Sequence, residues 1–323
     1  MIFSGHLQAS PCIIDVFSKT VNSLKNMPYT ITYSSLANVL PNQRLLMYQR
    51  IFNTNNPIEL HGTYIWSVKV AAAIQPLLST LEVALRNSIH TCGTQFIAPN
   101  WYEVLTTRVR TQYNQPKRDK ANIRWHHGEV SNIQKKLKTP PNGLTKHDLL
   151  VAKMDFGFWD NLLRECFSVN GDKKALWPQC TLSVFPNFPT GYTNATAQNE
   201  ISKLRDLRND IAHNSPVWKA RSVVDEQSAI LYLNQQIDKI IEVIGWLSTD
   251  KVNWIQVHML QAEAKRIASK DFLYLCQRKN MNPVCFSSFK RNLRKQFKNL
   301  HTEQFTVIHT NNESLFMLTK ISK

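Results

Sequence analysis

The chain has 323 residues, of which 43% are hydrophobic and 19% charged, so it can bury one large core or two modest ones and is not collagen-like, a coiled coil or disordered. Its 9 glycines and 14 prolines are few for a turn-rich β-sandwich and favour long helices. The formal net charge of +16 is typical of a protein that binds a polyanion, nucleic acid before membrane.

The sequence offers no strong signal for a membrane or for export. No stretch approaches the roughly 18 uninterrupted apolar residues of a membrane span. The first 17 residues lack a basic region and contain Asp15, unlike a secretory signal. The six cysteines form no CxxC pair, which favours reduced thiols over disulfides or a zinc site. We expect a soluble cytoplasmic protein without a metal or cofactor.

Apolar residues at steps of three and four predict helices in residues 64–90, 156–167, 197–213 and 225–247. Residues 168–196 contain scattered prolines and glycines and predict an irregular connection. Residues 290–298 are basic and predict a cationic helix. The expected fold is all-α, a helical bundle in residues 61–250 with an N-terminal helical extension in 1–60 and a basic helical extension in 251–323.

Residues 108–138 are the most basic stretch of the chain. Tyr113, Trp125 and the pair His126 and His127 are interleaved with its cations. The nine cations are Arg108, Arg110, Lys117, Arg118, Lys120, Arg124, Lys135, Lys136 and Lys138. The stretch is either a solvated loop, with the two histidines exposed, or a surface that holds phosphates and stacks on bases. We expect RNA contact here, with Trp125 among the contacting residues.

Residues 204–214 bring together the side chains that metal-free RNA cleavage requires. His213 can exchange a proton with a ribose 2′-hydroxyl or with the leaving 5′-oxygen near neutral pH. Arg208 stays charged and can hold the phosphate while negative charge develops on it. Asn209 lies one helical turn before His213. The alternative is structural: His213 caps a helix and Arg208 pairs with an acid.

The spacing of these residues constrains the geometry. On an ideal helix, Arg208 and His213 diverge by about 140°, so either the Arg208 side chain reaches round or the helix ends near His213. Pro216 favours the second possibility, because the residue before a proline avoids α geometry. A histidine at a helix C-terminus also has its charged form favoured by the helix dipole. We expect Glu82 to pair with Arg208.

The string RNDIAH, residues 208–213, resembles the Arg-x4-His signature of the HEPN superfamily of helical-bundle ribonucleases. With EVALRN (82–87), FGFW (156–159) and Trp218 in the expected order, residues 60 to 250 resemble the Abi abortive-infection family of bacteria, the group of AbiD and AbiF. The resemblance implies a HEPN-type bundle in a bacterial cytoplasm and anti-phage defence by a toxin that cleaves RNA. It also implies an active site shared across a homodimer and, in some relatives, a bound structured non-coding RNA.

A weaker repeat of the motif lies in residues 85–90. Arg86 and His90 share a helix face there and form either a second half-site or, with Asn87, hydrogen-bonding support for the first. Glu82 and Arg205 are the other expected supporting residues. Two functions remain: a metal-independent HEPN endoribonuclease, or a protein that grips a structured RNA without cleaving it.

Overall fold

The computed structural model describes residues 40, 42–109, 115–137, 143, 145–279, 290–291, 294–295, 298, 305–309 and 315–319. The chain divides into two compact units, residues 1–47 and 48–323. The division falls inside helix α2, and the first unit is otherwise described only at residue 40. The core and the candidate site described below belong to the second unit.

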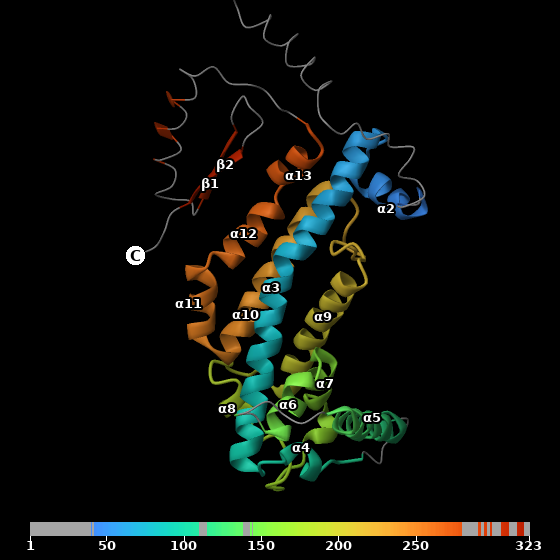
Figure 1. Ribbon diagram of the computed structural model, residues 1–323, viewed down its shortest axis with the longest axis vertical. Coiled ribbons are helices and arrows are strands. Elements are labelled where there is room, and N and C mark those ends of the chain that lie inside the picture. The colour runs from blue at the N-terminus through green and yellow to red at the C-terminus, as the bar shows by residue number, and fades with distance from the viewer. Residues whose placement is uncertain are drawn as a thin grey trace, which may run out of the picture. The chain divides into compact units, whose positions relative to one another are not determined.

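Apart from a short C-terminal hairpin, the described part of the chain is an all-α bundle, as predicted (Figure 1). Its α-helices are α2 (Asn42–Phe52), α3 (Pro57–Phe96), α4 (Trp101–Val104), α5 (Gln115–Lys136), α6 (Lys146–Lys153), α7 (Phe156–Leu162), α8 (Thr181–Val184), α9 (Asn194–Ala212), α10 (Glu226–Leu247), α11 (Thr249–Val257), α12 (Leu260–Ile267) and α13 (Lys270–Cys276). A 3₁₀ turn, η3, covers Glu165–Phe167. The four helices expected from periodicity are present as α3, α7 with η3, α9 and α10, and the connection between α7 and α9 is largely irregular.

The C-terminal extension is not helical throughout. Strands β1 (Phe305–His309) and β2 (Leu315–Thr319) pair in an antiparallel hairpin, with Phe305 opposite Thr319, where a helical extension was expected. Lys290, Arg291, Arg294, Lys295 and Lys298 are helical, in agreement with the predicted cationic helix.

Helix α3 is the central element of the bundle. It packs against α7, α8, α9, α10, α12 and α13, and in Figure 1 α9 and α12 lie to either side of it. The predicted stripe is fully buried and consists of Ile74, Leu77, Leu78, Leu81, Leu85 and Ile89. By length and composition α3 is also apolar enough to cross a membrane. The sequence search overlooked this helix because it looked for uninterrupted apolar runs. In the bundle, 39% of its 18-residue apolar window is buried.

The N-terminal half of α3 is fastened to the end of the helical region. Trp66 Nε1 donates a hydrogen bond of 2.8 Å to the carbonyl of Ile267, and Gln277 Nε2 donates one of 2.8 Å to Thr63 Oγ1. Gly62 lies against the Cys276 carbonyl so closely that a Cβ there would clash with it. These contacts hold α12 and α13 against a helix that lies about two hundred residues earlier in the sequence.

Candidate functional site

Helix α9 presents the Arg-x4-His motif because its apolar stripe is turned inward. Thr193 caps its start by accepting a hydrogen bond from the Thr196 N–H. Ala197, Ile201, Leu204 and Leu207 are the buried residues of the helix. Arg205, Arg208 and Asn209 therefore project from its partly exposed faces.

The helix ends where the sequence predicts it to end, at His213. The His213 N–H donates to the Asn209 carbonyl at 2.9 Å, the Asn214 N–H to Ile211 at 3.0 Å and the Ser215 N–H to Asp210 at 2.8 Å. Asn214 has a φ of 54°, so the turn is a Schellman motif with a left-handed residue directly after the cap. The His213 side chain is exposed at the negative end of the helix dipole.

The chain beyond this turn is anchored in the core. Trp218 is buried, and its ring packs edge-to-face against Tyr48 at 5.0 Å and Phe52 at 5.2 Å between centroids. Only four residues lie between the exposed histidine and this buried tryptophan. The turn that carries His213 is thus held from both sides, by α9 before it and by Trp218 after it.

Arg208 lies between a carboxylate and an aromatic ring. Its Nε is 3.9 Å from Glu82 Oε2 on α3, which confirms the expected pairing, and its guanidinium lies 5.8 Å from the centre of the Phe156 ring. The Arg208 side chain is 22% exposed, and its Nε has no hydrogen-bond acceptor among the described residues. Burial raises the pKa of the Glu82 carboxyl, and the Arg208 charge opposes that rise. An arginine held by charge and packing, but not saturated with hydrogen bonds, can still hold a phosphate.

Asp160 on α7 is a member of the cluster that sequence reasoning missed. Its side chain is fully buried, Arg205 Nη1 donates to Oδ2 at 2.5 Å and the Ser202 hydroxyl donates to Oδ1 at 2.5 Å. Arg164 Nη2 is 4.0 Å from the same carboxylate. Burial raises the pKa of Asp160, while these hydrogen bonds and charges oppose the rise. The only sequence signal was an acidic residue inside the apolar run FGFWDNLL.

Arg205 therefore has a structural role, and α7 joins the cluster to the rest of the fold. Arg205 also donates to the neighbouring Asp206 at 2.8 Å. Asn161, next to Asp160, donates from Nδ2 to the Asn122 carbonyl on α5 at 3.3 Å. One face of α7 thus contacts the helix of the Arg-x4-His motif and another contacts α5.

The motif repeat on α3 does not reproduce the geometry found on α9. His90 Nδ1 accepts a hydrogen bond from Trp101 Nε1 at 3.2 Å, and its ring lies 4.9 Å from that of His147. Burial, and then the His147 charge, lower the pKa of His90. Arg86 Nε donates to Asn87 Oδ1 at 3.3 Å. His90 is thus engaged in packing, whereas His213 is exposed at a helix end.

The basic stretch is mainly a helix rather than a loop. Lys117, Lys120, Arg124 and Lys135 on α5 recur on one helical face, and Arg118 and Lys136 flank them. All six side chains are exposed, and Trp125, beside this face, is 39% exposed. Lys117, Lys120, Arg124 and Lys135 are called the α5 cation stripe below. Arg108 precedes the helix and pairs with Glu165 at 2.7 Å, while Arg110 and Lys138 lie outside the described residues.

The expectation that His126 is exposed in a loop is wrong. It is 1% exposed on the opposite face of α5, stacks on Phe158 at 4.9 Å between ring centres, and hydrogen-bonds through Nε2 to the Tyr102 carbonyl at 3.1 Å. His127 is exposed, as expected, although it lies on the helix. Burial lowers the pKa of His126 to about 4.

Within the described part of the chain, no three His, Cys, Asp or Glu side chains lie together in a way that could hold a metal ion. The arrangement that remains is an exposed imidazole and a partly exposed guanidinium on α9, and a cationic helix, α5, that packs against α7. Comparison of the chain with known protein families, curated proteins and solved structures finds no match.

Proposed function

We propose that the chain is a metal-independent endoribonuclease of the HEPN superfamily, of the bacterial Abi type, that acts as a toxin in the cytoplasm during anti-phage defence. The observation that supports this most is the end of α9. His213 is exposed there, five positions after Arg208. Glu82 and Phe156 hold the Arg208 side chain in place. Imidazole and guanidinium are the two groups that cleavage through a ribose 2′-hydroxyl requires.

In this proposal His213 accepts the proton of the 2′-hydroxyl, and the 2′-oxygen bonds to phosphorus as the bond from phosphorus to the 5′-oxygen breaks. A protonated imidazole gives its proton to the leaving 5′-oxygen, so the products end in a 2′,3′-cyclic phosphate and a 5′-hydroxyl. Arg208 holds the phosphate oxygens as their charge grows. Asn209, on the same side of the helix as His213, hydrogen-bonds the RNA next to the reacting group.

One chain supplies one such histidine, whereas the reaction uses both a base and an acid. His90 is engaged with Trp101 and does not provide the second. The proposal is therefore a homodimer in which His213 of each copy faces one groove, so that one accepts the proton and the other donates it.

The α5 cation stripe is the proposed RNA-binding surface. Its exposed lysines and arginine neutralise phosphates, and the partly exposed Trp125 ring offers a surface on which a base can stack. The same feature favours a second candidate function, a protein that grips a structured, non-coding RNA without cutting it, because α5 carries this charge independently of α9.

Cleavage assays with the purified full chain separate the two functions. We expect labelled RNA to be cut in the presence of EDTA, leaving 2′,3′-cyclic phosphate ends, and we expect toxicity when the protein is expressed in bacteria. His213→Ala and Arg208→Ala should each lower the cleavage rate by at least about a hundredfold, which is the range that general acid–base catalysis and charge stabilisation contribute. Both variants should also lose the toxicity.

The matched control is His258→Ala, which removes another exposed histidine, at the end of α11. It should cut at the wild-type rate. Circular dichroism checks that each variant keeps its helices. Tight RNA binding without cleavage, or cleavage that survives His213→Ala, contradicts the nuclease proposal, and the first of these outcomes supports the RNA-gripping function.

A further inference from the structure

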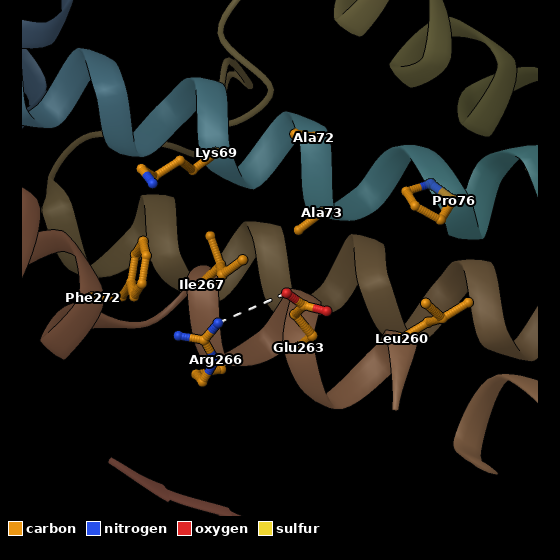
Figure 2. A pocket seen from close by; sticks show the side chains of 9 residues that line it. All are labelled: Lys69, Ala72, Ala73, Pro76, Leu260, Glu263, Arg266, Ile267 and Phe272. Carbon is orange, nitrogen blue, oxygen red and sulfur yellow. Dashed lines mark ion pairs between the residues drawn. The ribbon is translucent and has the colours of Figure 1, made fainter. Parts of the chain in front are cut away.

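A pocket of about 370 Å³ opens between α3 and α12, away from the Arg-x4-His motif. Figure 2 shows its walls: Lys69, Ala72, Ala73 and Pro76 come from α3, Leu260, Glu263, Arg266 and Ile267 from α12, and Phe272 from α13. Its volume is within the range of small-molecule sites, which begins at about 300 Å³.

The pocket exists because α3 carries small side chains at this point. Ala72 and Ala73 end a run of three alanines that begins at Ala71, and Pro76 follows inside the helix. Pro76 has no N–H to donate, so the Ala72 carbonyl loses its usual helical partner and keeps its capacity to accept a hydrogen bond. The wall on α3 is therefore recessed, and a carbonyl there lacks its helical donor.

Two cations converge on the ring of Phe272 at one end of the pocket. Lys69 Nζ lies 5.9 Å from the ring centre and Arg266 Cζ lies 5.2 Å from it. The structure gives Lys69 no carboxylate partner among the described residues, and Arg266 has only Glu263, at 3.8 Å, whose side chain is 54% exposed. Two cations against one carboxylate leave this end of the pocket with a net positive charge.

Arg266 also carries a hydrogen-bond donor that nothing satisfies. Its Nε is buried and has no acceptor among the described residues. A buried donor without a partner costs stability, and such groups are usually satisfied by water or by a bound molecule. Because Arg266 lines the pocket, an acceptor bound there can satisfy this donor.

We propose that this pocket binds a small organic anion. An oxyanion, a carboxylate or a phosphate monoester, lies between Lys69 and Arg266 and accepts from the unsatisfied donor. An apolar body fills the space lined by Ala73, Leu260 and Ile267. The two cations attract the charge and the aliphatic wall favours the apolar body, so a ligand needs both parts to bind well.

Titration of the full-length protein with 8-anilinonaphthalene-1-sulfonate, an apolar anion that fluoresces when it leaves water, tests the proposal. We expect saturable binding to one site. Decanoate or phenyl phosphate displaces the dye, and the stronger competitor identifies the oxyanion. Acetate lacks the apolar body and decanol lacks the charge, so neither competes at the same concentration.

Substitutions of the lining residues test whether the dye binds in this pocket. Lys69→Gln and Arg266→Gln each weaken dye binding about tenfold, the effect of about 1.4 kcal/mol. Ala73→Leu fills the recess and removes binding. The matched control is Lys251→Gln, because Lys251 also lies over an aromatic ring, Trp254, at 5.8 Å but outside the pocket.

Three results overturn the proposal: no saturable binding, equal displacement by decanol and decanoate, or dye affinity unchanged in both charge variants. Should Ala73→Leu lose its helical circular dichroism, the two charge variants decide alone. The assay does not depend on RNA, and Arg208→Ala should bind the dye as the wild type does, so this proposal and the proposed function can fail separately.

Discussion

Single buried polar groups decide much of the chemistry of this fold, and His126 shows how. The Tyr102 carbonyl can only accept, so the hydrogen of the neutral His126 ring must be on Nε2. The other nitrogen, Nδ1, is buried without a partner among the described residues. Protonation would place an N–H with no acceptor beside Phe158 and Phe167, and for that reason the ring remains neutral.

The consequence is a stability that depends on pH. The pKa of His126 is about 4 in the folded chain and about 6.5 in the unfolded chain, so below pH 6.5 the unfolded state binds the proton more readily. The free energy of unfolding therefore falls between about pH 6.5 and pH 4, by about 3 kcal/mol from this group, and the loss is complete below pH 4.

Urea unfolding at pH 7, 5.5 and 4.5 measures this effect. His126→Gln keeps a donor for Tyr102 but cannot be protonated, so its stability should vary less with pH than that of the wild type. His127→Gln changes the exposed neighbour and should keep the wild-type pH dependence. Parallel curves for wild type and His126→Gln would contradict the assignment.

At the scale of secondary-structure elements, the end of a helix determines the position of the side chain that it carries. The Schellman turn after α9 requires a left-handed residue, and Asn214 fills that position with a φ of 54°. Asparagine and glycine tolerate this conformation, whereas a side chain such as alanine is strained in it. The position of His213 thus depends on its neighbour.

Asn214→Ala should cost about 1 kcal/mol of unfolding free energy, and Asn214→Gly should cost little. Asn53 after α2 has a similar φ of 45°, so Asn53→Ala is a control with comparable strain far along the chain from the motif. On the proposed function, Asn214→Ala lowers the RNA cleavage rate and Asn53→Ala does not. Thermal unfolding and the EDTA-resistant assay measure both quantities; equal cleavage by the two alanine variants would count against a positioning role for the turn.

The sequence predicted the elements whose apolar residues repeat clearly. The stripes of α3, α9 and α10 are such repeats, and Pro216 located the end of α9. Helix α5 was missed because its buried face includes Asp119 and His126, which do not count as apolar. The Glu82 pairing was found through charge, whereas the role of Asp160 depends on contacts between residues 42 to 45 positions apart, which no local pattern reveals.

For the whole molecule, the net charge of +16 matters through its distribution. The α5 cation stripe concentrates exposed charge on one helix, and each phosphate contact of single-stranded RNA contributes about 0.7 to the slope of log affinity against log salt. A surface that binds RNA through these residues must therefore lose affinity steeply as salt rises.

Replacing two members of the stripe, Lys117 and Lys120, with glutamine should reduce the magnitude of that slope by about 1.4. The matched control replaces Lys173 and Lys174, two exposed lysines of the irregular connection, and should leave the slope unchanged. Fluorescence anisotropy of labelled RNA at several salt concentrations gives the values. An equal change in both double variants would mean that the charge of the chain acts diffusely.

The attachment of α3 to α12 and α13 also affects how the protein folds during translation. Trp66 emerges about two hundred residues before its acceptor Ile267 is translated. Until then the side of α3 that α12 and α13 cover lies open, and such late closure between sequence-distant segments is slow. A nascent chain halted before α12 would leave the Trp66 indole without its acceptor. A chaperone that binds apolar surface during translation should therefore raise the yield of folded protein.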